Sequence, residues 1–383
     1  MKKSFLRLLI LLFFGSLGLG QFLRIQLNPS VAIYGHDIIL GFIYLLFFLS
    51  GHKIKISSKQ KKLIKAIKPF IYILIFSLLI NIPSLGSKIL IPSMYLARVF
   101  FYLAIFPITA SLIKSKDIKT NLNKILLSTN AFLVFGGLVQ YFIFPDTRSF
   151  RLLGWDDHLN RSIGTLLDPN FFGLMLVLGL VLLVNSKIRY KKIHIFFTFI
   201  TFLLTYSRAS YLSLLAAGVV FGLQKGKTKQ ILIGSILFIS SLFLLPRPGG
   251  EGVRLERTAS IFQRIESQRQ GIDIFLKKPL FGIGFNSYKL YTQNKNKYDF
   301  IPNHPSSPDN SYLLILATTG IFGIMIFTKF SLDLTNEHSK NKLILPSLFA
   351  VGIHAFFNNS IFYPWVLIWI VTLLAQESSK GKT

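Results

Sequence analysis

The sequence predicts an all-α polytopic membrane protein with about twelve transmembrane helices and one large extracytoplasmic loop that contains a helix. Of the 383 residues, 51% are hydrophobic and only 15% are charged, whereas soluble domains carry about a quarter charged residues. Apolar runs that approach the ~20 residues needed to cross a bilayer recur along the chain, which excludes a soluble enzyme. The runs cover residues 5–22, 31–50, 67–82, 90–113, 125–144, 165–185, 193–206, 208–223, 231–246, 311–328, 343–357 and 361–376.

The formal net charge is +28, which in a soluble protein would suggest a nucleic-acid partner. Here the positive residues fall mostly in short connections between apolar runs, as topology selection produces. We therefore expect no nucleic acid to bind. The chain has no cysteine, which excludes disulfides, thiolate catalysis and zinc–thiolate sites.

Lysines mark every second connection between the apolar runs. Because lysine and arginine are retained on the cytoplasmic side, the pattern predicts a multi-pass protein with both termini in the cytoplasm. We expect the first run to be an uncleaved helix rather than a signal peptide, since no A-x-A-like cleavage site follows it. The lysines that define the pattern include Lys59, Lys61, Lys62, Lys65, Lys114, Lys124, Lys187, Lys191, Lys225, Lys229, Lys340 and Lys342.

This topology divides the chain into three parts. Residues 1–246 form helices one to nine, residues 247–310 form the extracytoplasmic loop that carries site residues, and residues 311–383 form helices ten to twelve and a cytoplasmic tail. Apolar residues at helical spacing predict a helix near residues 258–277 within the loop.

Arginine is concentrated on the predicted outer side, where it has no use in setting topology. The planar guanidinium binds phosphate oxygens in a bidentate manner and stays charged when partly dehydrated. The pattern therefore predicts an anionic ligand at the outer membrane face, and a pyrophosphate on a lipid fits that position. The outward arginines include Arg148, Arg151, Arg161, Arg208, Arg264 and Arg269.

Several of these residues have simpler interpretations. Asp168 and Asn170, which follow Arg161, can cap the helix that enters the membrane there. Arg208 lies in a tight hairpin, Thr205 to Ser210, where it can also snorkel to the interface. Arg269 can form an i,i+3 ion pair with Glu266 on a solvated helix.

A candidate general base lies at the end of the long loop. Asp309 and Asn310 occupy the start of the helix that follows, where either can act as an N-cap, and a carboxylate there can also accept a proton from a hydroxyl. His304 is the second candidate base. Gly282 and Gly284 lie earlier in the loop and indicate a backbone turn rather than a dinucleotide site, because the required strand and helix are absent.

Two ionisable residues lie at membrane depth. Asp37 is just inside the outer end of the second run, and Arg98 is within the fourth. Such groups are rare in membranes, so these two line the groove for a lipid substrate, snorkel, or form a structural pair. The cluster Asp156-Asp157-His158 can bind a divalent cation, but a solvated loop is the simpler interpretation.

Four motifs in this order are similar to the O-antigen ligase and polymerase superfamily, polytopic glycosyltransferases of the GT-C type that use undecaprenyl-pyrophosphate-linked glycans. The resemblance extends from Arg161 to Gly323. The motifs are Arg161 with Gly164-Thr165 and Asp168-Pro169-Asn170, Thr205 with Ser207-Arg208-Ala209-Ser210, Arg264 followed by Pro279, Gly282 and Gly284, and Asp309-Asn310 with Tyr312-Leu313, Gly320 and Gly323.

The resemblance implies that Arg208 and Arg264 bind the pyrophosphate, and that no metal or other cofactor takes part. The family usually has a histidine directly before the asparagine of the last motif, where this chain has Asp309, and His304 lies five residues earlier. Either the base is the Asp309 carboxylate, which we favour on register, or His304 reaches the same place through the proline-rich turn.

The sequence thus predicts a glycosyltransferase of the bacterial cytoplasmic membrane. It would move a glycan from undecaprenyl pyrophosphate to a hydroxyl of an acceptor glycan or lipid-linked sugar at the outer face, as a polymerase or as a ligase. The alternative is a transporter or flippase of lipid-linked oligosaccharides. Transporters place their binding groups near the midplane and contain internal repeats, whereas here the arginines collect at one face.

Overall fold

The structure is a computed structural model that describes residues 3–28, 31–51, 54, 56–114, 122–295 and 307–379. Each predicted apolar run contains at least one α-helix. These helices are α1 (Lys3–Leu19), α2 (Gly35–Leu49), α3 (Ser58–Ile80), α5 (Leu90–Leu103), α6 (Ile105–Lys114), α7 (Leu122–Ile143), α8 (Pro169–Val184), α9 (Lys191–Leu203), α10 (Arg208–Leu223), α11 (Thr228–Phe243), α14 (Ser311–Glu337), α15 (Ile344–His354) and α16 (Pro364–Ser379).

Four helical segments in the described part of the chain are long and apolar enough to cross a membrane, namely Ser58–Ile80, Ile82–Ser111, Leu122–Ile143 and Ser311–Glu337. The remaining apolar helices are shorter. This composition fits the predicted all-α membrane protein, and the number of twelve crossings stays a prediction.

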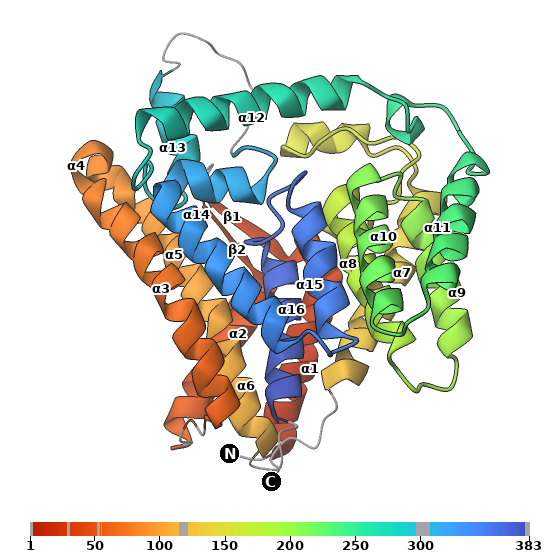
Figure 1. Ribbon diagram of the computed structural model, residues 1–383, viewed down its shortest axis with the longest axis horizontal. Helices are drawn as coiled ribbons and strands as arrows, with labels where there is room; N and C mark the ends of the chain where they lie inside the picture. The colour runs from red at the N-terminus through yellow and green to blue at the C-terminus, as the bar shows by residue number, and fades with distance from the viewer. Residues whose placement is uncertain are drawn as a thin grey trace.

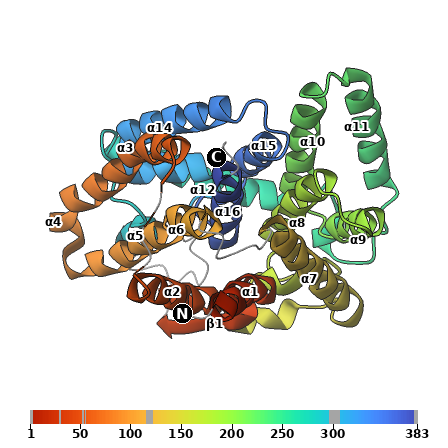
Figure 2. The same ribbon diagram turned by 90° about the horizontal axis from the view of Figure 1, so that it is seen from below.

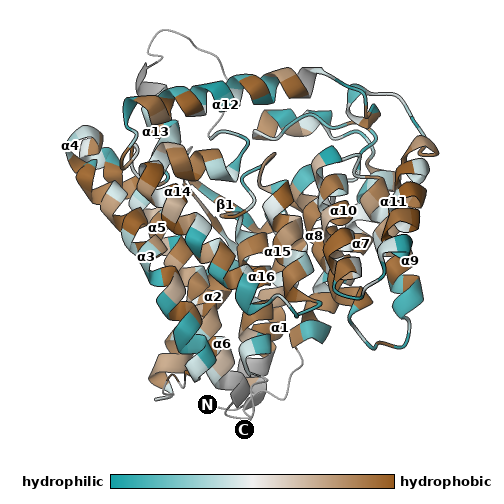
Figure 3. Cartoon of the chain, viewed as in Figure 1, coloured by the Kyte–Doolittle hydropathy of each residue, from teal (hydrophilic) through white to brown (hydrophobic). Residues whose placement is uncertain are grey.

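The outer faces of the helices are apolar and exposed. A soluble monomer rarely exposes a large contiguous apolar surface, whereas a membrane protein presents one to the lipid. Figure 3 shows that hydrophobic residues predominate along the helices of the bundle. Examples of exposed apolar side chains on α1, α2 and α11 are Leu8, Leu12, Phe42, Phe48, Leu232 and Leu237.

The centre of the bundle is formed by α8 and α16. Residues 172–183 of α8 are buried throughout, as expected for a helix that is apolar on every side. Figures 1 and 2 place α16 in the middle of the bundle, where it contacts α6, α7 and α15. Trp365 and Trp369 of α16 are fully buried there.

The helix predicted near residues 258–277 is confirmed as α12 (Ala259–Lys277). Figure 1 shows α12 lying across one end of the bundle, whereas α1 begins and α16 ends at the opposite end. The short helices α4 (Ile82–Leu85) and α13 (Tyr288–Lys295) lie at the same end as α12. The described part of the long loop therefore lies at one end of the bundle, and α1 begins and α16 ends at the other.

The second apolar run differs from the prediction of a continuous helix over residues 31–50. Its first residues form the strand β2 (Val31–Tyr34), which pairs antiparallel with β1 (Arg24–Asn28), and α2 begins only at Gly35. The physical reason is local: β-branched and aromatic residues favour a strand, and Pro29 between the two strands disfavours helix. Hydrophobicity alone does not separate such a strand from a helix.

A break in α14 joins the long loop to the bundle. Gly320 has φ +70° and ψ −167°, a conformation that essentially only glycine adopts. The carbonyls of Ala317 and Thr318 next to the break accept hydrogen bonds from the backbone N–H groups of Ile283 and Gly284, at 3.1 and 3.0 Å. Gly282 and Gly284 both have positive φ, which confirms the predicted backbone turn.

Candidate functional site

A polar cavity of about 970 Å³ lies beneath α12. Its wall combines the β hairpin, α5, the connection from Asp156 to Asn170, the first part of the long loop, α13 and the connections before α14 and α16. Segments far apart in the sequence thus meet at one end of the bundle.

Of the predicted site residues that the structure describes, the cavity brings together six and leaves out four. Arg98, Arg161, Asp168, Asn170, Arg264 and Asp309 line it. Asp37, Arg208, Arg269 and Asn310 are not part of the lining, and His304 lies outside the described residues.

Arg161 is a buried cation whose hydrogen bonds go to backbone carbonyls. Its Nε donates to the carbonyl of Thr205 at 2.9 Å and its Nη2 to that of Tyr206 at 3.4 Å. Burial and the neighbouring charge of Arg257 lower the pKa of Arg161 to about 9, so the side chain is still protonated at neutral pH. No carboxylate of the described residues forms an ion pair with it. A buried charge is costly unless it is paired, which favours an anionic ligand here.

Arg257 is a second cation of this wall, which sequence reasoning missed. Its Nη1 donates to the carbonyls of Gly252 and Arg254, both at 2.8 Å. Burial and the charges of Arg208 and Arg264 lower its pKa to about 10. The sequence offered no signal for it, because Arg257 is one of several arginines in a turn-rich stretch without a regular pattern.

Arg208 is not part of the cavity lining but contacts the segment that carries Arg257. Its Nη1 donates to the carbonyls of Leu255 and Arg257, at 3.1 and 3.0 Å. The side chain therefore holds the backbone that carries Arg257, instead of simply snorkelling to the interface. Its charge is near enough to contribute to the positive field of the cavity.

Arg264 lines the cavity from α12 and is half-buried. It forms no hydrogen bond or ion pair with any residue that the structure describes, so its guanidinium is free to bind a ligand. Arg269 on the same helix is exposed, and the expected ion pair with Glu266 is not formed. Of these two arginines, which the sequence predicted to bind the same ligand, only Arg264 lines the cavity.

Asp309 faces the same cavity. Its backbone N–H donates to Ser267 Oγ of α12 at 3.1 Å, which joins the start of α14 to the helix that carries Arg264. Burial and the charge of Asp156 raise the pKa of the Asp309 carboxyl, while Arg264 opposes this. Asn310, not Asp309, caps α14: its Oδ1 accepts from the backbone N–H groups of Tyr312 and Leu313, both at 3.0 Å.

Asp168 caps α8, as predicted. Its Oδ1 accepts from the backbone N–H groups of Asn170 and Phe171, at 2.6 and 3.1 Å. Asn170 has a different role, because its Oδ1 accepts from Ser207 Oγ at 2.9 Å and its carbonyl contacts His354 Nε2 at 3.1 Å. These contacts fix the arginine-bearing hairpin against α8 and α15.

Asp37 and Arg98 form the structural pair that was one of the expected alternatives. Arg98 Nη2 lies 3.1 Å from Asp37 Oδ2 and also donates to the carbonyl of Ala32, while Tyr102 donates to Asp37. The pair ties the hairpin to α2 and α5. Arg98 lines the cavity as well.

The cluster at residues 156–158 also lines the cavity. Asp157 pairs with Arg151 at 3.3 Å. Burial and the charges of Arg161 and Arg257 lower the pKa of His158 to about 3, so it is neutral at physiological pH. In the described ranges no three acidic, histidine or cysteine side chains are grouped to hold a metal ion.

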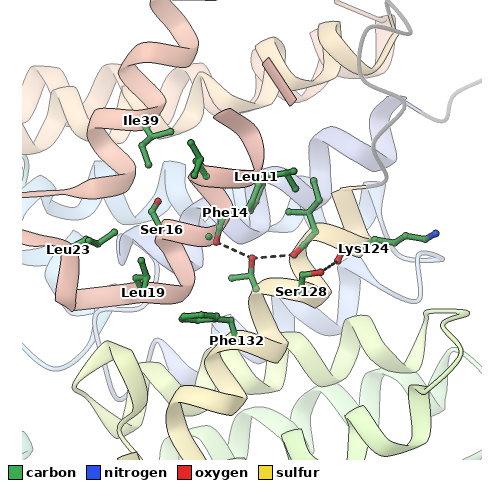
Figure 4. Close-up of a pocket in the computed structure, with 13 residues that line it drawn as sticks. Leu11, Phe14, Ser16, Leu19, Leu23, Ile39, Lys124, Ser128 and Phe132 are labelled. Atoms are coloured by element: carbon green, nitrogen blue, oxygen red, sulfur yellow. Dashed lines mark hydrogen bonds between the residues drawn. The ribbon is translucent and has the colours of Figure 1, made fainter. Parts of the chain in front are cut away.

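A second hollow, of about 880 Å³, lies between α1 and α7. Figure 4 shows apolar side chains around it, with Lys124 at one side. The hydroxyls of Ser16, Ser128 and Thr129 bond to backbone carbonyls of their own or the neighbouring helix, so they offer little to a polar substrate. The polar cavity is therefore the candidate site.

A family model described as O-antigen ligase matches residues 193–328. The matched segment extends from α9 into α14 and includes Arg208, Arg264 and Asp309. It confirms the resemblance to the O-antigen ligase superfamily that the motifs indicated. No curated protein matches the chain.

Proposed function

We propose that this chain, whose residues 193–328 match a family model described as O-antigen ligase, is a glycosyltransferase of the bacterial cytoplasmic membrane. The match to this family indicates glycan transfer in a membrane. The proposal adds that the donor is a glycan on undecaprenyl pyrophosphate, and that the acceptor is a sugar hydroxyl at the outer face.

The observation that carries the proposal is the set of arginines without carboxylate partners. Arg161, Arg257 and Arg264 line one wall, and none of them forms an ion pair with the described carboxylates. Their mutual repulsion is unfavourable until an anion binds. A pyrophosphate carries several negative oxygens, and the guanidinium group matches phosphate geometry.

The same arginines suit the chemistry of transfer. When the bond between the sugar and the pyrophosphate breaks, negative charge develops on the leaving oxygen. Preorganised cations at that place lower the barrier. Arg208 contributes to the donor site by its charge and by holding the Arg257 backbone in place.

The acceptor hydroxyl must lose a proton during the attack. Asp309 lines the same cavity as Arg264. The positive charge of Arg264 favours the ionised form of the Asp309 carboxylate, which a general base requires. Ser267 positions the Asp309 backbone. We therefore keep Asp309 as the proposed base, with His304 as the alternative that the experiments below distinguish.

The test is a reconstituted reaction. Purified protein in lipid nanodiscs receives a saccharide on undecaprenyl pyrophosphate and an acceptor, and release of undecaprenyl pyrophosphate is measured together with the extended glycan. We expect both products from the native chain and neither from Arg264→Ala. Glycan movement across a vesicle membrane without any release of undecaprenyl pyrophosphate would indicate the transporter instead.

A further inference from the structure

We propose that Arg24, which lines the same cavity from the β hairpin, holds the phosphate of a lipid-linked acceptor, so that the protein extends one lipid-linked saccharide with another. This inference rests on the proposed function and adds the class of the acceptor.

Arg24 is a fourth cation of the cavity that has no anionic partner among the described residues. It is at the start of β1, lines the cavity, and its guanidinium carbon lies 5.0 Å from the centre of the Trp155 ring. Its Nε is buried and has no hydrogen-bond partner, and no ion pair with the described residues compensates its charge. Arg98 beside the hairpin differs, because it is paired with Asp37. Arg24 thus supplies the uncompensated charge at the hairpin.

A row of aromatic contacts leads from the strand partner of Arg24 to Phe171 of α8, on the Arg161 side of the cavity. Tyr34, the β2 partner of Arg24, contacts Trp365 at 5.2 Å between ring centres; Trp365 contacts Tyr363 at 5.0 Å, and Tyr363 stacks on Phe171 at 3.9 Å. Phe171 adjoins Asn170 on the Arg161 side. Arg24 is also not among the charges that shift the pKa of Arg161 or of Arg257, whereas Arg264 acts on both. We therefore treat Arg24 as a cationic group separate from the other three in the same cavity.

The middle of the cavity has the composition of a saccharide site. Tyr34, Phe171 and Tyr363 line it with aromatic rings. Asn358 Nδ2 and Asn359 Oδ1 are buried at the same lining and have no hydrogen-bond partner. Apolar faces with a few unsatisfied polar groups are typical of small-molecule sites, and amide groups can bond to sugar hydroxyls.

The hairpin also indicates that the anion belongs to a lipid. Alternate residues of a strand face opposite sides: Arg24 and Gln26 line the cavity, whereas Ile25 and Leu27 are apolar and about half exposed, at 51% and 55%. The strand follows α1 through the short helix Gly20–Leu23. Arg24 therefore lies where an apolar surface meets a polar cavity, which is the level of lipid phosphates.

The transfer balances as follows. The acceptor hydroxyl oxygen bonds to the anomeric carbon of the donor, and the bond from that carbon to the pyrophosphate oxygen breaks with its electron pair. The hydroxyl proton goes to the base. The pyrophosphate of the acceptor stays intact, so the product is a longer lipid-linked glycan, and the activity is that of a polymerase.

The experiment compares two acceptors with the same saccharide, one on undecaprenyl pyrophosphate and one on a neutral alkyl chain. The native chain should prefer the first. We expect Arg24→Gln, and Arg24→Ala beside it, to raise the KM for the pyrophosphate-linked acceptor at least about tenfold, since a charged hydrogen-bonding group is lost. The KM for the neutral acceptor and for the donor should not change.

A binding measurement separates this inference from the proposed function. With undecaprenyl pyrophosphate as the probe, we expect two equivalents on the native chain, one on Arg24→Gln and one on Arg264→Ala. Arg254→Ala is the matched control, because Arg254 is exposed and outside the cavity. Two sites without any transfer would refute only the proposed function. Unchanged stoichiometry in Arg24→Gln, or a preference that follows an acidic sugar instead of the lipid anchor, would overturn the inference.

Discussion

Replacing Arg264 with alanine tests the proposed donor site most directly, because this side chain forms no hydrogen bond or ion pair with the described residues that the substitution would remove. Arg264 is half-buried and has no hydrogen-bonding or ionic partner among the described residues. Its truncation leaves no buried group unsatisfied. We therefore expect the free energy of unfolding to change by no more than about 0.5 kcal/mol.

The loss of function should be much larger. A hydrogen bond to a charged group contributes about 1.5–3 kcal/mol, and a bidentate contact with phosphate contains two of them. We expect the loss to be at least about 3 kcal/mol, or more than about a hundredfold in kcat/KM. Arg264→Lys keeps the charge without the planar fork, so we expect it to be about tenfold impaired.

The measurement is kcat/KM for release of undecaprenyl pyrophosphate, with thermal unfolding recorded on the same samples. Arg254→Ala removes the same charge from an exposed position of the same loop and should retain full activity. Arg269→Ala decides whether the other arginine of α12 contributes, as the sequence suggested. If Arg264→Ala stays folded and within about threefold of the native kcat/KM, the pyrophosphate assignment is wrong.

Three further experiments test the base, the fold and the topology. We expect Asp309→Asn to abolish transfer while donor binding remains. Burial raises the pKa of the Asp309 carboxyl, so the native transfer rate should fall as the pH drops through that raised pKa. A transfer rate that already falls below about pH 6.5, together with an inactive His304→Ala, would favour histidine as the base. We expect Gly320→Ala to unfold at lower temperature, with a loss of at least about 2 kcal/mol, since a Cβ there would lie 2.1 Å from the Leu280 carbonyl oxygen; an unchanged Tm would contradict the strained break. A cysteine at Glu266, which is exposed, should react with an impermeant thiol reagent from outside and one at Ser58 should not, and the opposite result would invert the topology.

The helices were predictable because hydrophobic runs and turn residues are local signals. The runs contained helices, and α12 appeared within a residue or two of its predicted range. The strand β2 was missed because four apolar residues next to a longer apolar helix have no periodicity of their own. Strand pairing depends on the partner, which sequence spacing does not reveal.

Two arginines of the candidate site could be predicted because their positions do not follow the charge rule that sets membrane topology. Arg161 and Arg264 were identified because arginine on the outer side has no topological use, and both line the cavity. Arg24 and Arg257 were missed, because one ends an apolar run and the other lies in an irregular turn. What assembles them is tertiary packing, which single-sequence patterns do not encode.

The break at Gly320 has a consequence for how the protein responds to its membrane. Transmembrane helices tilt when the bilayer becomes thinner or thicker. In α14 the turns before Gly320 are fastened to the loop by the hydrogen bonds of Ile283 and Gly284. The longer part after Gly320 belongs to the segment Ser311–Glu337, which is long and apolar enough to cross a membrane. The glycine can therefore absorb the tilt as a hinge. The spacing between Asp309 and Arg264 would then stay constant while the lipid around the protein varies in thickness.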